Sequence, residues 1–211
     1  MTAGAAVQPS PIGRMRVLPD GHVPDLAAAE TAAEGFLRAL GVPTHRPGLD
    51  DTPRRMAQAY AEMLTPRTFD LTTFPNDEGY DELVLARSIP VQSLCEHHML
   101  PFVGVAHVGY HPRDRIVGLS KLARVVELFA RRPQVQERLT KQVADWLHDQ
   151  LQPRGVGVVL EAEHLCMSLR GVRSLGSTTV TSTLLGTLRN DPSLRSESRT
   201  LTSQPVRRAG S

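Results

Sequence analysis

Residues 95–110 read CEHHMLPFVGVAHVGY, and the second half of this stretch decides the fold class. The part from Phe102 to Tyr110 is rich in β-branched and aromatic residues, which is typical of a strand. The turn sequence HPRDR follows and leads into a short IVGL segment. Directly before Cys95, LVLARSIPVQSL at residues 83–94 predicts a partner strand, in which Pro90 indicates a sheet edge or a bend. The centre of the chain therefore predicts a β-hairpin.

Two helices are predicted after the hairpin. Ser120 is the expected cap of a helix over residues 120–132. A longer helix is expected over 134–152, with apolar residues four apart on a face that we assign to the core: Val135, Leu139, Val143, Leu147 and Leu151. From residue 155 onward, GVGVVLEAEH, LCMSLR and TTVTSTLLGTL predict further strands. Together these elements predict an α+β fold, with a mostly antiparallel sheet that carries both helices on one face.

A pair of helices is predicted before the hairpin. The first spans 25–40, with Asp25 as its cap. The second spans 52–64, with Thr52 as its cap and Pro53 in the first turn, where the missing N–H costs nothing.

The remaining segments lack a periodic pattern. Residues 67–80 predict a long loop. The two ends are rich in Gly, Pro, Ser and Arg and predict solvated tails. The expected division is a flexible tail over 1–24, a helical region over 25–66, the main domain over 67–190, and a mobile C-terminal tail over 191–211.

The composition excludes several classes of protein. The chain has 211 residues, with 24 Lys+Arg against 22 Asp+Glu and a net charge of +2. This length suits one globular domain, and the small charge argues against a nucleic-acid or acidic-membrane partner. No apolar run approaches the ~18 residues that a membrane span needs. No secretory signal is recognised, so we expect a cytoplasmic protein whose two cysteines stay reduced.

The two cysteines lie in the segments that are richest in metal-binding residue types. Cys95 and His98 are separated by two residues, a spacing that lets both side chains reach one metal ion. Cys166 lies 71 positions after Cys95 (166 − 95), two residues after His164. Three such ligands would leave one coordination position open, which is typical of a catalytic rather than a structural zinc site. The alternative to a metal site is that both cysteines are buried and inert and that the histidines beside them are ordinary surface residues.

Other site templates are absent from the sequence. There is no His-Glu-x-x-His pair, no Pro-Cys-x-x-Cys deaminase pattern, no phosphate-binding Gly-x-x-x-x-Gly-Lys loop and no complete dinucleotide fingerprint. A bound triphosphate would therefore need basic side chains, for which the candidates are Arg54, Arg55, Lys121, Arg124 and Arg170. Taken alone, these residues are equally consistent with an ordinary solvated basic surface.

Several long, collinear segments resemble GTP cyclohydrolase I. They are CEHHMLPFVGVAHVGY, GLSKLARVVELFARRPQVQERLTKQ, HLCMSLRGV, TVTSTLLG and TPRRMAQAY, and the resemblance covers roughly residues 50–190. It implies the tunnelling fold (T-fold), a homodecamer and active sites at subunit interfaces. It also implies GTP as substrate, 7,8-dihydroneopterin triphosphate and formate as products, one zinc ion per subunit, and the entry step of folate or tetrahydropterin synthesis.

The resemblance also implies roles for single residues. The family's zinc ligands fall on Cys95, His98 and Cys166, in agreement with the spacing. Its catalytic histidines fall on His97 and His164. The guanine-binding carboxylate falls on Glu137, beside Gln136, and the ribose and phosphate contacts fall on Ser120, Lys121, Arg124, Arg170 and Arg55.

The implied reaction accounts for these residue types. Water must attack guanine C8, and a zinc ion makes water nucleophilic near neutral pH. N7 must be protonated, and a histidine can supply and recover that proton at pH 7. After formate is released, an Amadori rearrangement moves protons on the ribose, with Ser120 and a histidine as candidates. Which of His97 and His164 serves which step stays open.

Two departures and two alternatives accompany the resemblance. The family commonly has an acidic residue where this chain has Ser88 and another residue at Pro90, and SESRTLTSQ replaces its Glu-Phe-Leu near the C-terminus. These differences bear on subunit contacts more than on catalysis. The alternatives are a non-catalytic nucleotide-binding paralogue and a related T-fold enzyme acting on another base. The complete set of cysteines and histidines in CEHH and HLC argues against both.

Overall fold

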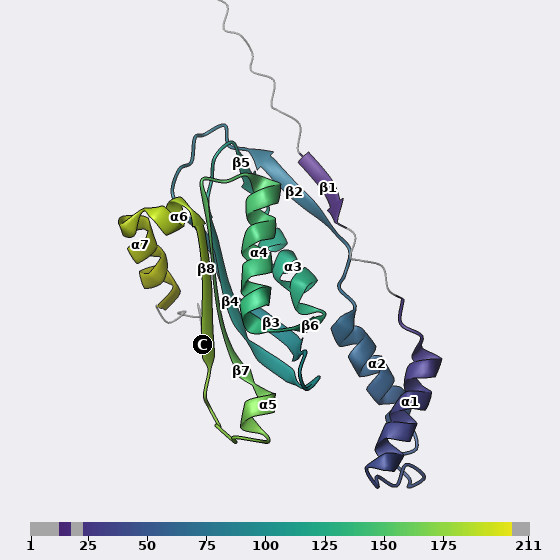
Figure 1. The fold of residues 1–211 in the computed structure, drawn as a ribbon. Helices are drawn as coiled ribbons and strands as arrows, with labels where there is room; N and C mark the ends of the chain where they lie inside the picture. Colours follow the sequence, from purple (N-terminus) through teal and green to yellow (C-terminus); the bar gives the residue numbers. More distant parts are fainter. Residues whose placement is uncertain (1–12, 18–22, 204–211) are drawn as a thin grey trace, which may run out of the picture.

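Five strands form the main sheet in the order β6-β3-β4-β7-β8 (Figure 1). A computed structural model describes residues 13–17 and 23–203. The strands are β3 (Val84–Cys95), β4 (Pro101–His111), β6 (Pro133–Gln134), β7 (Gly155–His164) and β8 (Thr179–Gly186). Neighbours pair antiparallel except β3 with β6, which is parallel. The predicted hairpin and the mostly antiparallel sheet are confirmed.

Two helices cover one face of this sheet, α3 (Leu119–Ala130) and α4 (Gln136–Leu151) (Figure 1). Alternate residues along β4 and β7 contribute buried side chains to the core, among them Phe102 and Ala106 on β4 and Leu160 on β7. The predicted apolar face of α4 lies in the same core, with Leu139, Val143, Leu147 and Leu151 buried. The α+β class and the placement of both helices on one face are thus confirmed.

A second, three-stranded sheet corrects two predictions. It consists of β1 (Gly13–Val17), β2 (Phe69–Pro75) and β5 (Arg115–Val117), paired in that order. A loop was expected where β2 lies, yet Phe69, Leu71 and Thr73 alternate as buried residues along it. The expected tail contains β1, which has three exposed central residues because its order comes from pairing with β2. Residues 1–12 and 18–22 of that tail lie outside the described residues.

Two further predictions are wrong near the C-terminus. LCMSLR was predicted as a strand, but α5 (Leu165–Ser168) is a single helical turn, too short to show a helical period. The expected C-terminal tail contains all of α7 (Pro192–Ser203), and α6 (Thr187–Asn190) ends directly before it. Asp191 caps α7, since its carboxylate accepts the N–H groups of Ser193 and Leu194 at 2.8 and 3.3 Å. Residues 204–211 lie outside the described residues.

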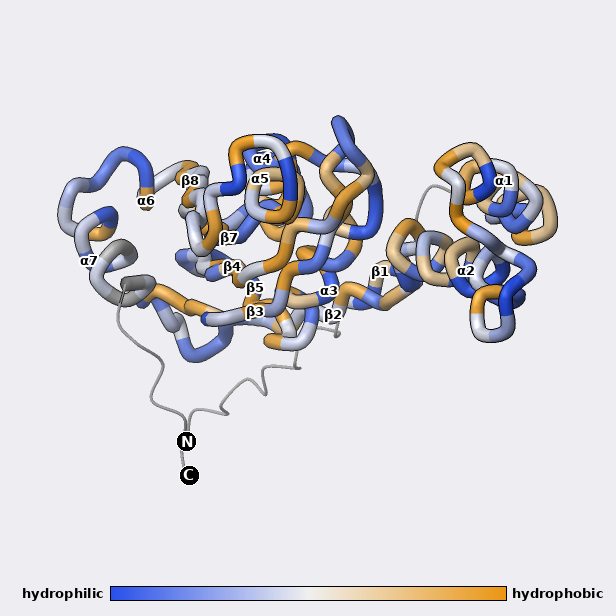
Figure 2. Tube along the Cα trace, turned by 90° about the horizontal axis from the view of Figure 1, so that it is seen from below, coloured by the Kyte–Doolittle hydropathy of each residue, from blue (hydrophilic) through white to orange (hydrophobic). Residues whose placement is uncertain are grey.

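The N-terminal helices lie beside the main sheet. They are α1 (Leu26–Ala39), which Asp25 caps as predicted, and α2 (Thr52–Leu64). Figure 2 shows this pair on one side of the molecule and α6 and α7 on the opposite side. Among the described residues, no helix has the length and apolar character needed to cross a membrane.

Two predicted helix caps are wrong. The N-cap of α2 is Asp51, not Thr52, although Pro53 occupies the first turn as predicted. The N-cap of α3 is Gly118, so Ser120 lies inside the first turn and does not cap the helix.

Candidate metal centre

A tight turn between β3 and β4 brings Cys95 and His98 together. The Cys95 carbonyl accepts the N–H of Met99 at 2.7 Å, and the Cys95 N–H donates to the Leu100 carbonyl at 2.9 Å. Met99 has a φ of 54°, a left-handed conformation that few non-glycine residues adopt. Because the chain reverses within these few residues, His98 Nδ1 lies 3.9 Å from Cys95 Sγ.

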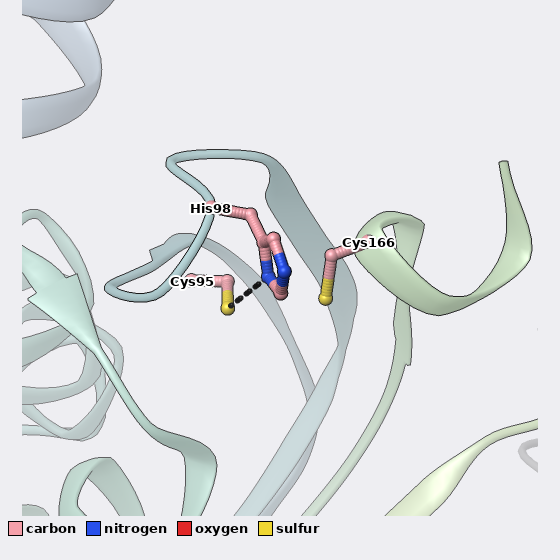
Figure 3. A group of neighbouring side chains, drawn as sticks. All are labelled: Cys95, His98 and Cys166. Carbon is pink, nitrogen blue, oxygen red and sulfur yellow. Dashed lines mark hydrogen bonds between the residues drawn. The ribbon is translucent and has the colours of Figure 1, made fainter. Parts of the chain in front are cut away.

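Pairing of β4 with β7 brings the second cysteine to this turn. Phe102 lies opposite His164 in the strand register, so the end of β7 is next to the start of β4. The helical turn α5 then presents Cys166. One ligand atom from each of Cys95, His98 and Cys166 lies within 4.8 Å of the others (Figure 3). The sequence separation of 71 positions is thereby closed, as the spacing predicted.

The chemistry of these three side chains fits zinc. Both cysteines are buried, whereas His98 is exposed and leaves the group accessible from outside. Burial raises the pKa of the Cys166 thiol, and the adjacent Cys95 sulfur raises that pKa further. A divalent cation between the sulfurs would favour both thiolates, and two sulfurs with one imidazole suit zinc. Three protein ligands leave a fourth position for water or substrate.

The two histidines expected to be catalytic both lie next to this group. His97 Nδ1 is 3.7 Å from Cys95 Sγ. His164 stacks on Phe102, with ring centroids 4.6 Å apart and an interplanar angle of 13°. Its Nε2 lies 2.7 Å from Gln136 Oε1. Burial lowers the pKa of His164, and the negative charge of Glu137 partly opposes this shift. The ring therefore favours its neutral form near pH 7.

The N-terminus of α4 carries the residues expected to meet guanine. Gln136 and Glu137 open the helix, and the Glu137 side chain is exposed. The N–H groups of a first helical turn lack intrahelical acceptors and favour anionic or carbonyl partners. Gln136 Oε1 lies 2.7 Å from His164 Nε2, so this helix end adjoins the end of β7 that leads to Cys166.

Arg170 is the one expected phosphate contact that lies at the metal group. Its Nη1 lies 3.2 Å from His98 Nε2 and donates to the Cys166 carbonyl at 3.5 Å. The other expected ribose and phosphate contacts are on different elements, Arg55 on α2 and Ser120, Lys121 and Arg124 on α3. Arg55 pairs with Asp51 at 3.5 Å, and Arg124 pairs with Glu127 at 3.0 Å.

Glu127 gathers three arginines around one carboxylate on α3. Partial burial alone would raise its pKa, but Arg67, Arg131 and Arg124 outweigh burial and hold the pKa below its ordinary value. Arg131 also donates to the carbonyls of Glu62 and Thr65, at the C-terminal end of α2. The cluster therefore ties α2 to α3.

The structure adds three residues around the centre that the sequence did not single out. Phe102, which the pattern placed in a strand core, is the stacking partner of His164. Arg138 pairs with Glu96 in the metal-binding turn. The Tyr60 hydroxyl donates to the Met99 carbonyl at 3.2 Å. The Arg138–Glu96 and Tyr60–Met99 contacts join residues 42 and 39 positions apart along the chain, and no local sequence pattern indicates them.

A family model and several similar sequences point to one family. A family model described as GTP cyclohydrolase I matches residues 29–203. A Mycobacteroides abscessus protein named GTP cyclohydrolase 1 is 55% identical over 186 residues, covering 85% of this chain and 90% of the relative. A Streptomyces avermitilis protein of the same name is 54% identical over 182 residues, covering 84% and 90%. One from Aquifex aeolicus is 50% identical over 173 residues, covering 82% and 94%.

Proposed function

The chain belongs to the GTP cyclohydrolase I family, and from this we propose that it holds one zinc ion per subunit on Cys95, His98 and Cys166. Its function is that of a GTP cyclohydrolase I, a hydrolase that opens the guanine imidazole ring of GTP at C8 and releases formate. The product is 7,8-dihydroneopterin triphosphate, in the first step of folate and tetrahydropterin synthesis. The observation that carries the zinc proposal is the cluster of three ligand atoms within 4.8 Å.

Zinc, when bound, would supply the Lewis acidity that makes water nucleophilic at neutral pH. The chain's own residues then have to place the base and move protons. His97 and His164 are the proposed proton carriers, since both lie beside the ligand group and an imidazole can take up and release a proton at pH 7. Phe102 holds the His164 ring by stacking, so the ring does not need to reorient during catalysis.

Guanine selection is proposed to rest on Glu137. A carboxylate offers two acceptors to the adjacent ring N–H and 2-amino group of guanine, and adenine lacks this donor pair. Glu137 lies in the first turn of α4, next to Gln136, which contacts His164. Gln136 is proposed to meet the base through its main-chain N–H, because its side chain is only 2% exposed and bonds within the protein.

The triphosphate is proposed to be held by basic residues from more than one subunit. Arg170 lies at the metal group of its own chain. Lys121 and Arg124, with Ser120 for the ribose, are on α3, and Arg55 is on α2. A site shared between subunits would bring such separate elements to one ligand.

We further propose that the chain forms a T-fold homodecamer in the cytoplasm. The main sheet ends at β8, which pairs only with β7 among the described strands. Beside it, a group of apolar residues is exposed: Leu169, Val172, Leu175 and Val180. An open strand edge with exposed apolar side chains favours pairing with another copy of the chain.

The first test of this function is product formation. The zinc-loaded protein is incubated with GTP, and neopterin fluorescence after oxidation and released formate are measured. Both products are expected in equal amounts. Absence of both from zinc-loaded, oligomeric protein would contradict the assignment.

The second test is metal content. Replacing Cys95 or Cys166 with Ser is expected to lower zinc from one per subunit to near zero, because a hydroxyl is a far weaker zinc ligand than a thiolate. Met167→Ser puts a serine at the neighbouring, exposed position of α5 and should retain the metal. Unchanged zinc in both cysteine variants would show that the ligand set is different.

A further inference from the structure

Both the nitrogen and the oxygen of the Gln136 side-chain amide have hydrogen-bond partners. The residue is buried and opens α4. Its Nε2 lies 3.1 Å from the Leu160 carbonyl oxygen, 2.8 Å from the Thr179 carbonyl oxygen and 3.1 Å from Thr181 Oγ1. Its Oε1 lies 2.7 Å from His164 Nε2. One amide thus joins α4, the neighbouring strands β7 and β8, and a histidine of the proposed active site.

The partners of this amide determine its orientation. Carbonyl oxygens only accept hydrogen bonds, so the atom facing Leu160 and Thr179 must be the NH₂ group. The opposite orientation would place the amide oxygen against two carbonyl oxygens in a buried site, which is strongly unfavourable. The amide oxygen therefore faces His164.

The orientation of the amide in turn determines where His164 carries its proton. An amide oxygen only accepts, so His164 Nε2 must donate and must bear a hydrogen. In the neutral ring the other nitrogen, Nδ1, then has a free lone pair. The face of the ring is fixed by Phe102, which is stacked on it at 4.6 Å.

The surrounding hydroxyl groups make the amide rigid. Thr140 Oγ1 donates to the Gln136 carbonyl at 2.8 Å and lies 2.6 Å from Thr181 Oγ1, which contacts the Gln136 amide nitrogen. Gln136 and Thr140 are both buried. The contacts of His164 are therefore held by α4 and β8 together, not by the flexible end of a long side chain.

We infer that Gln136 is a positioning residue that fixes His164 in the Nε2–H tautomer and so makes Nδ1 the nitrogen that exchanges protons with the substrate. This inference rests on the proposed function, in which His164 is a proton carrier. Any proton that His164 exchanges with the substrate would therefore be gained and given back at Nδ1, and the ring would return to its neutral form after each exchange. The Nε2 proton stays on His164 throughout, hydrogen-bonded to Gln136 Oε1, so no net proton is gained or lost by the ring.

A neutral amide suits this role better than a carboxylate. A carboxylate bonded to His164 would stabilise the imidazolium form and hold the proton. The uncharged Gln136 orients the ring through the same hydrogen bond while leaving the charge on the ring less stabilised.

Nuclear magnetic resonance tests the tautomer directly. The zinc-loaded full-length protein is labelled with ¹³C,¹⁵N-histidine, sedimented, and its histidine ring nitrogens and carbons are correlated in the solid state. A His164 signal in the Nε2–H tautomer is expected, assigned as the signal that changes in Gln136→Met. A His164 ring with its neutral-form proton on Nδ1 would overturn the inference, whether or not the enzyme turns over GTP.

Steady-state kinetics tests the consequence. Gln136→Met keeps similar volume but no acceptor, and should lower kcat by about 10–100-fold, as loss of a supporting hydrogen bond does elsewhere, with KM for GTP and zinc content unchanged. Gln136→Glu keeps an acceptor oxygen toward His164 but places its other oxygen against the Leu160 and Thr179 carbonyl oxygens, so it should not restore the wild-type kcat. Gln142→Met replaces another α4 glutamine, which bonds Gln134 and not His164, and should retain wild-type kcat.

The outcomes separate the inference from the function. A folded Gln136→Met variant with wild-type kcat would overturn the positioning role. Should that variant fail to fold, the tautomer of the wild-type protein decides the inference. Wild-type protein that forms no product would overturn the proposed function, and the nuclear magnetic resonance result would still decide whether Gln136 sets the tautomer.

Discussion

At the scale of single residues, two carboxylates near the metal group have different surroundings. Glu96 forms an ion pair with Arg138, which lowers the pKa of Glu96 and balances its negative charge. Within the described residues Glu137 forms no ion pair, although it lies in the first turn of α4. A carboxylate that the protein leaves available at the site is the better candidate for binding a ligand.

Replacement of Glu137 tests this distinction. Glu137→Ala should lower kcat/KM for GTP by about 10²–10⁴-fold, because the paired guanine donors lose both acceptors. Neopterin fluorescence measures the rate. Asp145→Ala removes another α4 carboxylate, which pairs with Lys141, and should leave the rate unchanged. Retained turnover in Glu137→Ala would eliminate Glu137 as the guanine anchor.

His107 gives a prediction for stability. It lies on β4, and its Nδ1 accepts the Ser88 N–H at 3.4 Å. Burial is the main cause that lowers its pKa; the charge of Arg87 lowers it further and that of Glu161 opposes the shift. Below the unfolded-state pKa, near 6.5, the unfolded chain therefore binds more protons than the folded chain. The contribution of neutral His107 to stability is present above that pH and is lost as the pH falls through the folded-state pKa.

Thermal unfolding of a His107→Gln variant checks this sign. The variant should be less stable than the wild type at pH 8, and the difference in Tm should shrink as the pH falls from 7 to 5, since Gln does not titrate. Both proteins keep the same zinc ligands, so acid-induced metal loss largely cancels in the difference. A Tm difference that stays constant or widens over this range would show that His107 is not held neutral by the fold.

At the scale of elements, the turn after β3 is held from outside. It contains the left-handed Met99, a conformation that costs of order 1 kcal/mol or more for a side chain of this kind. The Tyr60 hydroxyl on α2 bonds the Met99 carbonyl. An element that carries no metal ligand therefore supports the turn that presents His97 and His98.

Removal of that one hydroxyl should loosen the metal. Tyr60→Phe is expected to speed zinc dissociation by about 10-fold, in line with other changes that disturb the support of metal ligands. Capture of released zinc by a chromophoric chelator measures the rate. Tyr80→Phe removes a hydroxyl from an exposed tyrosine outside the site and should have no effect. Equal dissociation rates in both variants would show that the turn does not depend on α2.

At the scale of the whole molecule, the proposed oligomer depends on the edge of the main sheet. Val180 lies on β8 and is 61% exposed in the single chain. A lysine there would place a charge against any second copy that pairs along this edge. The assembly and the active site would then be lost together if residues of two subunits share one substrate.

Light scattering coupled to size exclusion measures this outcome. Val180→Lys should shift the protein from a decamer to smaller species and lower GTP turnover in parallel. Gln150→Lys adds the same charge at the exposed end of α4 and should keep the wild-type mass. A Val180→Lys protein that remains decameric and active would place the interface elsewhere.

A segment could be predicted from the sequence where its own residues carry the pattern of its helix or strand, and not where its order depends on pairing with another strand. The segments that became β4, β7 and α4 carry their own apolar pattern, because they bury one or both faces in the core, and they were predicted. β1 was missed because its exposed residues show no alternation and its order depends on β2. The C-terminal α7 was missed because its sequence, PSLRSESRTLTS, contains few apolar residues.

The sequence by itself determined the donor set of this protein: two cysteines, each within two or three positions of a histidine, in segments that belong to a recognisable family. Only the tertiary structure decided that these segments meet, because antiparallel pairing of β4 with β7 places Phe102 opposite His164 and so brings Cys166 to Cys95. It also decided the partners of Gln136 and Tyr60. Hydrogen bonds between residues 28 and 39 positions apart depend on strand register and helix packing, which no local pattern contains.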